Sequence, residues 1–295
     1  MNNKIYGVLD VGSNSVRALV YSDGKILYSG LITSRLGEGL AKTGELSSEA
    51  IIRTYSAVKT LTDKCSEYKT DKIFVFATEA VRSAKNGEDF CKLLREDGIE
   101  TDVLSGDEEG EIGLLGALGG KDGGIIDIGG ASAEIVVAKG GKIIYSHSLP
   151  LGAVRLTDTC GEDENLLYKT INGRISEYGN LPEEVDFKFI GGTATALATV
   201  NYGIKNYSDD KVNGLTINGA DLTVCIKRLK ETPLADRAGK FGISKKRAEI
   251  IIAGAVMIKS IMGNFGIGSV EVSTNDNMLG YIKKKVYGEG YEREI

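Results

Sequence analysis

The sequence predicts an α/β protein of two similar domains with a cleft between them. Its 295 residues exceed what one compact core usually serves and are enough for two domains of ordinary size. The chain also contains one strand-and-turn layout twice, and each copy is followed by alternating helical and extended patterns. Such alternation is typical of a sheet covered by helices.

The repeated layout is an apolar strand, an aspartate, a small polar turn, a second strand, a Gly-Lys hairpin and a third strand. In the first copy Asp10 opens the turn, and Lys25 lies in the hairpin 15 residues later (25 − 10). In the second copy Asp127 and Lys142 have the same spacing of 15 (142 − 127). Because the spacing is kept over a whole three-stranded meander, we interpret the two segments as copies of one unit.

The boundary between the domains is predicted near 119–122, where glycines interrupt both patterns. One domain then covers 1–121 and the other 122–295, and a terminal helix from about residue 278 can pack back on the first domain. Apolar periodicity predicts the elements between the repeated strands: helices over 47–68, 89–96, 166–178 and 245–262, and strands over 72–77, 187–190 and 269–273.

Composition excludes several classes of protein and site. His147 is the single histidine, so sites that need several imidazoles are excluded. The four cysteines lie far apart with no CxxC pair, which signals neither zinc nor a disulfide framework. The net charge of −5 argues against a broad nucleic-acid surface, and no apolar run is long enough to span a bilayer. We expect a cytoplasmic protein without nucleic-acid or membrane partners, and the sequence leaves a homodimer open.

The two aspartate turns are suited to holding phosphate and a metal ion. Small residues let backbone N–H groups point at an anion, and Asp10 and Asp127 at the ends of facing strands offer oxygen ligands to Mg²⁺. The alternative is that the glycines only shape tight hairpins, which we would favour for a single copy. Two copies favour the phosphate interpretation. The predicted phosphate ligands in these turns are Gly12, Ser13, Asn14, Ser15, Gly129, Gly130 and Ser132.

A third small-residue turn, 191–195, follows a predicted strand and opens a helix, so Gly192 and Thr193 are further candidates for binding phosphate. The nucleotide-binding loops GxxxxGK[ST] and GxGxxG are absent, as is the GxSxG elbow, so P-loop ATPases, Rossmann dehydrogenases and serine hydrolases are not indicated. The basic runs 245–247 and 283–285 are interpreted as solvated helix faces.

Six motifs in order resemble the exopolyphosphatase/guanosine pentaphosphate phosphohydrolase family over nearly the whole chain. They are Asp10–Arg17, Ala77–Arg82, Ser105–Gly110, Asp127–Glu134, Ser148–Leu156 and Gly191–Thr195. The resemblance implies two actin-like (ribonuclease H-like) domains, each a mixed five-stranded sheet flanked by helices. It also implies a Mg²⁺-dependent phosphohydrolase that releases terminal phosphate from polyphosphate or from a phosphorylated guanosine nucleotide.

The resemblance implies roles for individual side chains. Glu109 would be the general base that activates water, and its neighbour Glu108 is the structural alternative because Ser105-x-x-Glu108 fits a helix capping box. Arg82 would clamp the transferred phosphoryl group. Glu134 would help position metal or water or would simply be exposed, and Arg17 would reach phosphate or pair with a carboxylate.

The sequence departs from the family pattern at Ala131, Ala133 and Glu111, where the family has glycine, threonine and arginine. These departures motivate an alternative function, a non-catalytic sensor of polyphosphate or guanosine nucleotides. A small-molecule kinase of the same fold is a second alternative, because fold alone does not determine chemistry. Because the chain stops after two core domains, we expect short polyphosphates or a guanosine nucleotide rather than long polymers.

Overall fold

The computed structural model describes residues 4–293, so the outermost ends of the predicted domains, 1–3 and 294–295, lie outside it. The first half forms a five-stranded mixed sheet in the order β3-β2-β1-β4-β5. Its strands are β1 (Tyr6–Val11), β2 (Val16–Ser22), β3 (Lys25–Ile32), β4 (Lys72–Ala77) and β5 (Thr101–Val103). The meander β1–β3 is antiparallel, whereas β4 and β5 run parallel to β1.

The second half repeats this order in a seven-stranded sheet, β10-β11-β9-β6-β7-β8-β12. Its core strands are β6 (Gly123–Ile128), β7 (Ala133–Lys139), β8 (Lys142–Leu149), β9 (Phe187–Ile190) and β11 (Ser269–Val272). The order β8-β7-β6-β9-β11 matches that of the first sheet and confirms the predicted duplication. Two short edge strands, β10 (Thr216–Asn218) and β12 (Glu292–Arg293), extend the sheet beyond the predicted five.

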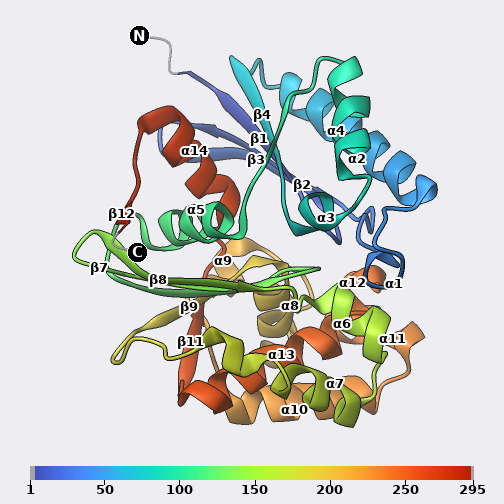
Figure 1. The fold of residues 1–295 in the computed structure, drawn as a ribbon, viewed down its shortest axis with the longest axis vertical. Helices are drawn as coiled ribbons and strands as arrows, with labels where there is room; N and C mark the ends of the chain where they lie inside the picture. The colour runs from blue at the N-terminus through green and yellow to red at the C-terminus, as the bar shows by residue number, and fades with distance from the viewer. Residues whose placement is uncertain (1–3, 294–295) are drawn as a thin grey trace.

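The helices of each half include long ones that cover the outer face of its sheet (Figure 1). Those of the first half are α1 (Leu40–Thr43), α2 (Ser48–Ser66), α3 (Glu79–Ser83) and α4 (Gly87–Glu96). Those of the second half are α6 (Ala153–Cys160), α7 (Glu164–Asn172), the 3₁₀ turn Ile175–Tyr178, α8 (Gly191–Tyr202), α9 (Asp209–Val212), α10 (Gly219–Lys230), α11 (Leu234–Phe241), α12 (Lys245–Ala248) and α13 (Ile251–Phe265). Across residues 4–293 no helix has both the length and the apolar character needed to cross a bilayer.

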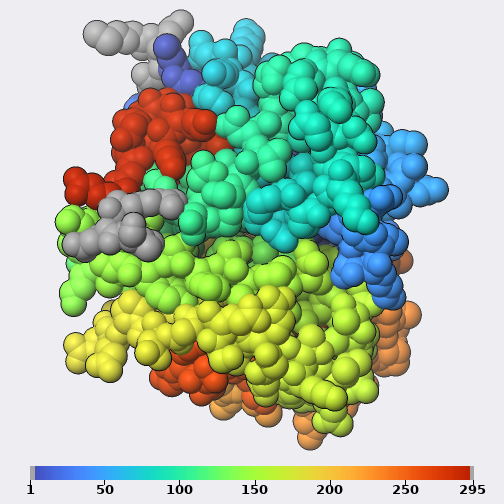
Figure 2. All heavy atoms as spheres, viewed as in Figure 1, coloured from blue at the N-terminus to red at the C-terminus, as the bar shows by residue number. Residues whose placement is uncertain are grey.

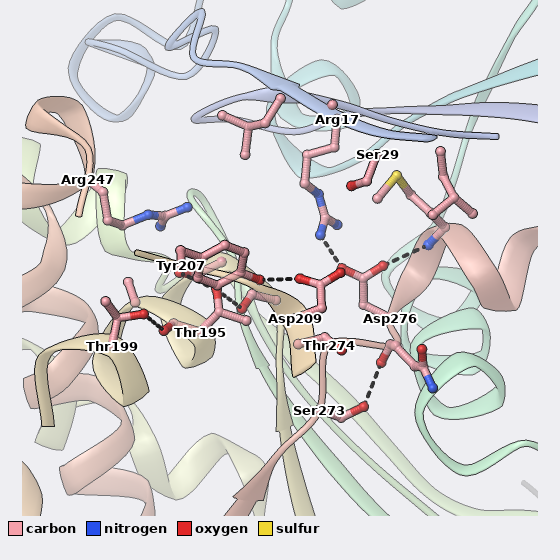
Figure 3. A pocket seen from close by; sticks show the side chains of 18 of the residues that line it. Arg17, Ser29, Thr195, Thr199, Tyr207, Asp209, Arg247, Ser273, Thr274 and Asp276 are labelled. Atoms are coloured by element: carbon pink, nitrogen blue, oxygen red, sulfur yellow. Dashed lines mark hydrogen bonds and ion pairs between the residues drawn. The ribbon is translucent and has the colours of Figure 1, made fainter. Parts of the chain in front are cut away.

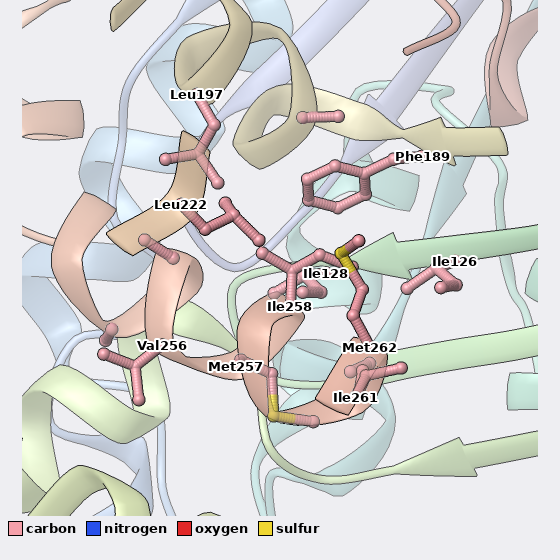
Figure 4. Packing of buried hydrophobic residues seen from close by; sticks show 14 of the residues in the cluster. Ile126, Ile128, Phe189, Leu197, Leu222, Val256, Met257, Ile258, Ile261 and Met262 are labelled. Atoms are coloured by element: carbon pink, nitrogen blue, oxygen red, sulfur yellow. The ribbon is translucent and has the colours of Figure 1, made fainter. Parts of the chain in front are cut away.

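The larger core lies beneath the second sheet, where α13 is apolar on almost every side. Figure 4 shows Ile258, Ile261 and Met262 of this helix among Leu197 of α8, Leu222 of α10 and the sheet side chains Ile128 and Phe189. A helix that is apolar all round is stable only when it is buried, which explains its central place. One helix was predicted over 245–262, but the chain forms two helices interrupted at residues 249–250.

Two helices, α5 (Gly106–Leu118) and α14 (Asn277–Tyr287), lie between the two sheets (Figure 1). Their backbones touch, because a Cβ added to Gly280 would lie 1.7 Å from the carbonyl oxygen of Ile112. The terminal helix packs on the first sheet, where the ring of Tyr281 stacks on Phe76 with centroids 4.8 Å apart. The opposite side of α5 packs on the second sheet, through residues that include Leu115.

The two halves meet closely on the face that Figure 2 shows. At the end of the cleft near α1, the amide of Gly39 donates to Asp158 Oδ2 at 2.8 Å, and Arg35 pairs with Glu249 at 2.7 Å. These bonds join segments far apart in the sequence and hold the two halves against each other.

Candidate active site

The two aspartate turns have the same geometry and face each other across the cleft. The amide of Gly12 donates to the carbonyl of Ser15 at 3.1 Å, and Gly129 makes the same bond to Ser132 at 3.0 Å. A Cβ added to Gly130 would lie 2.6 Å from the Cβ of Ser13, so only glycine allows the turns to come this close. The duplicated sequence therefore forms two halves of one site.

A small cavity of about 70 Å³ lies between these turns. Most of the residues predicted from the sequence line it: Asp10, Gly12, Ser13, Asn14, Ser15, Arg17, Glu109, Asp127, Gly129, Gly130, Ser132 and Gly192. The structure thus brings together residues from both halves and from α5. Gly191 also belongs here, because its φ of +82° and the closeness of Asp127 Oδ1, 2.6 Å from an added Cβ, exclude a larger residue.

Three predicted residues lie outside the lining of this cavity. The hydroxyl of Thr193 donates to the carbonyl oxygen of Ile128 at 2.7 Å, so this side chain joins α8 to β6, and a contact of its backbone amide with phosphate stays a prediction. Glu134 lies behind the cavity and accepts from Ser148 Oγ at 2.7 Å. Arg82 likewise lies outside, with Nη1 3.6 Å from Glu109 Oε2.

Glu108 and Glu109 have the separate roles that the capping pattern predicted. Ser105 Oγ accepts from the amide of Glu108, and Glu108 Oε2 accepts from the amide of Ser105 at 2.9 Å, which completes a capping box. Glu109 is only 7% exposed and faces the cavity. Burial first, and then Glu134 and Asp127, raise the pKa of Glu109 well above its ordinary value, although Arg82 lowers it.

The other carboxylates of the site are also shifted towards the protonated form. Burial and then Glu134 raise the pKa of Asp127 well above its ordinary range. Burial raises the pKa of Glu134 to about 7, against hydrogen bonds from Ser132 and Ser148 that lower it. Burial also raises the pKa of Asp10, in spite of Arg17. Negative charge is therefore in excess, and a bound cation would relieve it.

The side-chain oxygens of the site are suitable ligands for a hard cation such as Mg²⁺. Several buried oxygens of the site lack a hydrogen-bond partner: Asp10 Oδ1, Asn14 Oδ1, Glu109 Oε2, Glu134 Oε2 and Asn277 Oδ1. Within residues 4–293, however, no group of three or more Asp, Glu, His or Cys side chains could hold a metal ion. Asp10, Asp127 and Glu134 are thus not gathered into one cluster of three in this structure, and their role as metal ligands stays a prediction. Mg²⁺ commonly uses one or two carboxylates and completes its shell with water and substrate phosphate.

Arg17 is held by two carboxylates in the wall of the small cavity. Its Nε donates to Asp10 Oδ2 at 3.1 Å, and its Nη1 pairs with Asp276 Oδ2. Although burial lowers it, the charges of Asp276 and Asp10 raise the pKa of Arg17. Both interpretations from the sequence are thus compatible, because Arg17 pairs with carboxylates and still lines the cavity.

Arg247 is a cation of the site that the sequence interpretation missed. It was assigned to a solvated helix face, but its side chain is half-buried and lines the small cavity. No hydrogen bond or ion pair of its guanidinium group occurs among the described residues, and burial and Arg17 lower its pKa to about 10. An unpaired cation in this position is suited to an anionic ligand. The one signal was Ser244, which caps α12 through the amide of Arg247 but does not indicate where the side chain points.

Asn277, the first residue of α14, is a second missed residue of the site. Its Nδ2 lies 3.4 Å from Asp127 Oδ2, and it lines the small cavity. A larger cavity of about 420 Å³ adjoins the small one and shares Arg17, Gly191, Gly192 and Arg247 with it (Figure 3).

Comparison with known proteins decides the family. The model of the Ppx/GppA phosphatase family matches residues 22–276. The chain belongs to this family. The solved structure of the Aquifex aeolicus Ppx/GppA family member has 27% sequence identity and a TM-score of 0.78, and the match covers 97% of this chain and 98% of that one. The predicted actin-like fold of two α/β domains is thereby confirmed.

Two curated relatives share similar levels of identity with this Ppx/GppA chain. Exopolyphosphatase 2 of Mycobacterium tuberculosis is 27% identical over an alignment of 305 positions, which covers 92% of this chain and 95% of that protein. The bifunctional 3-dehydroquinate synthase/phosphatase of Fusobacterium nucleatum is 28% identical over an alignment of 318 positions. That match covers 97% of this chain but 47% of the relative, so the chain spans about half the length of the bifunctional protein.

Proposed function

We propose that the chain is a Mg²⁺-dependent phosphohydrolase that releases terminal orthophosphate from short polyphosphate, from guanosine pentaphosphate or from both. The observation that carries the proposal is the carboxylate of Glu109, which is buried, lacks a hydrogen-bond partner at Oε2 and faces two phosphate-type turns in one cavity. A carboxylate placed in this way can accept a proton from an attacking water.

Glu109 acts as the general base in this proposal. A base needs a pKa close enough to the working pH to accept a proton while it is still ionised, and burial shifts Glu109 in that direction. Arg82 Nη1, 3.6 Å from Glu109 Oε2, limits this rise and holds the carboxylate in place. In this structure Arg82 thus contacts the proposed base Glu109. Its predicted contact with the transferred phosphoryl group stays a prediction.

The remaining groups bind and neutralise the phosphates. The two aspartate turns and the side chains of Arg17 and Arg247 line the small cavity, so backbone amides and guanidinium groups are the groups that would bind phosphate there. Asp10 and Asp127 would hold Mg²⁺, which would neutralise charge on the phosphoryl oxygens during transfer. In-line attack by water on a phosphoryl group depends mainly on such positioning and charge compensation.

The choice of substrates rests on the relatives. Curated relatives named exopolyphosphatases support polyphosphate as a substrate. A guanosine nucleotide is supported only by membership of the Ppx/GppA family. The small cavity has room for a terminal phosphate group, and the preference for short chains stays a prediction.

The test compares two neighbouring glutamates by phosphate release from tripolyphosphate and guanosine pentaphosphate. Glu109→Gln is expected to lose about 10²- to 10⁴-fold in kcat with Mg²⁺ present. Glu108→Gln is the matched control and should keep its activity, because glutamine also completes a capping box. Full activity in Glu109→Gln, or equal activity in EDTA, would contradict the proposal. Tight binding of both compounds without release would instead identify the sensor.

A further inference from the structure

Glu79, the first residue of α3, joins two arginines that come from different halves of the molecule. Its Oε2 accepts hydrogen bonds from Nε and Nη2 of Arg82, at 3.1 and 2.6 Å. Its Oε1 accepts from Nη2 of Arg155, on α6 of the second half, at 3.3 Å. The side chain of Glu79 is only 13% exposed, and charge-assisted bonds are stronger when they are shielded from water. We call these three side chains the arginine bridge.

At one end of the arginine bridge, Arg82 leads to the proposed base. Its Nη1 donates to the carbonyl oxygen of Leu104 and lies 3.6 Å from Glu109 Oε2. Its Nε and Nη2 are bound to Glu79, so each of the three guanidinium nitrogens has a partner. Because a guanidinium group is planar and rigid, these bonds leave it one orientation. Arg82 is thus presented to Glu109 as a fixed charge.

At the other end of the arginine bridge, Arg155 leads to the second aspartate turn. Its Nε donates to the carbonyl oxygen of Ala131, which lines the small cavity, at 3.0 Å. The amides of Val154 and Arg155 donate to the carbonyl oxygen of Gly130 at 2.7 and 3.0 Å, so α6 begins directly on this turn. The arginine bridge therefore connects a phosphate-type turn of one half with the proposed base of the other.

The charges around Glu109 explain why its cation has to be held. Burial, Glu134 and Asp127 raise the pKa of Glu109, whereas Arg82 lowers it and so helps to keep the base ionised. Burial also raises the pKa of Glu134, and Arg82 is among the groups that lower it. A guanidinium group that could turn freely would therefore be shared between two carboxylates. A displacement of about 1 Å at a reacting group can cost about 10²-fold in rate.

We propose that Glu79 and Arg155 are positioning residues for the reaction, because the arginine bridge holds Arg82 against Glu109 and ties it to the second aspartate turn. The base is then held in its working position only while the two halves keep this arrangement, since each half supplies one end of the bridge. This inference rests on the proposed phosphohydrolase function, in which Glu109 is the base.

Glu79→Ala tests the arginine bridge at its centre. We measure kcat and KM with Mg²⁺ for tripolyphosphate and for guanosine pentaphosphate. The change should lower kcat about 30- to 100-fold and keep KM within about threefold of the wild type, because the base is loosened while the groups that line the small cavity stay. Glu177→Ala is the matched control and should keep the wild-type kcat. It also removes a carboxylate bound to an arginine three residues away, Arg174, but lines neither cavity of the site.

Arg155→Met tests whether the second half acts on the base through Glu79. Alone it should lower kcat about tenfold, the loss expected for one hydrogen bond between charged groups. In the Glu79→Ala background the same change should lower kcat by less than about twofold, because the arginine bridge is already broken there. Arg155→Lys should restore only part of the loss, since one ammonium group does not reproduce the fork that binds Ala131 and Glu79.

The outcomes separate this inference from the proposed function. Losses in kcat that multiply in the double variant would overturn the inference and leave the phosphohydrolase intact, as would a Glu79→Ala variant that raises KM and keeps kcat. If the wild type releases phosphate from neither compound, the proposed function fails and the inference fails with it. Urea unfolding checks the fold of each variant. If Glu79→Ala does not fold, Glu79→Gln replaces it and should lower kcat about tenfold, and a wild-type kcat in that variant would count against the arginine bridge.

Discussion

Replacing Arg247 with methionine is expected to make the protein more stable and a weaker binder of phosphate. The guanidinium group is half-buried beside Arg17 and has no hydrogen bond or ion pair among residues 4–293. Arg247→Met removes the charge and keeps most of the aliphatic length, so the packing of the side chain changes little.

The size of the effect follows from the lowered pKa. A pKa of about 10 is roughly two to three pH units below the ordinary pKa of arginine. A difference of one pH unit in a pKa corresponds to about 1.4 kcal/mol. The charged form therefore costs the folded protein about 3 kcal/mol at pH 7, where Arg247 is still protonated. Because solvent and relaxation reduce such costs, we expect Arg247→Met to raise the free energy of unfolding by about 1–2 kcal/mol.

The same substitution at Arg17 should have the opposite sign. Arg17 is paired with Asp10 and Asp276, so Arg17→Met leaves two buried carboxylates without their cation. Breaking a buried pair in this way costs about 3–5 kcal/mol. Lys245→Met, at an exposed position near Arg247, is the neutral control and should stay within about 0.5 kcal/mol of the wild type.

The assay is urea unfolding without Mg²⁺ or phosphate, followed by the same titration with tripolyphosphate and Mg²⁺. Ligand should stabilise the wild type in proportion to its affinity and should stabilise Arg247→Met much less, with KM raised about tenfold or more. A loss of more than about 1 kcal/mol in ligand-free Arg247→Met, or an unchanged KM, would refute the assignment of Arg247 as an unpaired cation reserved for phosphate.

The Arg247 side chain passes close to Gly192, so a substitution of Gly192 tests its position. A Cβ added to Gly192 would lie 2.3 Å from Arg247 Nη2, so Gly192→Ala must push the guanidinium group aside. Gly192 has no positive φ, and the displaced group is the end of a flexible side chain. We therefore expect unchanged stability with a KM raised about tenfold, and a KM equal to that of the wild type would contradict this placement of Arg247.

Two other predictions concern the helices between the sheets. Gly280→Ala should cost about 3 kcal/mol in unfolding free energy and about 10²-fold in kcat, because the added methyl group would drive α5 and α14 apart; Gly263→Ala, on a helix with open space around it, should be neutral or stabilising. Asp102→Asn should lower Tm at pH 7, and this difference should shrink as the pH falls below about 3.9. Although burial raises it, hydrogen bonds from Lys285 and Tyr281 lower the pKa of Asp102 overall, so its stabilisation is present above about pH 3.9 and is lost as the pH falls through the folded-state pKa. A Tm difference that stays constant as the pH is lowered from 7 to 2 would refute the assignment.

The repeated strands could be predicted from the sequence because their signals are local. Each apolar strand is followed directly by its own turn, and β4 and β9 have the predicted bounds. The short edge strands β10 and β12 have three and two residues, too few for a periodic pattern. The break at residues 249–250 and the insertion of α14 beside α5 depend on contacts between distant segments, which no local pattern records.

The same division applies to the site. The glycine and serine turns, Asp10 and Asp127 could be identified because each turn brings its own aspartate. Glu109 could be distinguished from Glu108 because a capping box uses a fixed spacing. Arg247 was missed because the cavity that its side chain lines is formed by segments far away in the sequence. The hydroxyl of Thr193 binds the carbonyl group of Ile128, 65 residues earlier, which no local pattern indicates either.

The duplication predicts the same backbone layout in both copies but not the same charged side chains. The strand register shows where the side chains differ. Asp10 of β1 lies opposite Arg17 of β2, whereas Asp127 of β6 lies opposite Glu134 of β7 at the equivalent position. The first copy therefore pairs its carboxylate with a cation, while in the second copy Glu134 raises the pKa of Asp127 and also contributes to the high pKa of Glu109. This one difference between the repeated strand pairs gives the first half a carboxylate that is already partly neutralised, whereas the second half depends on a proton or a bound cation to offset its charge.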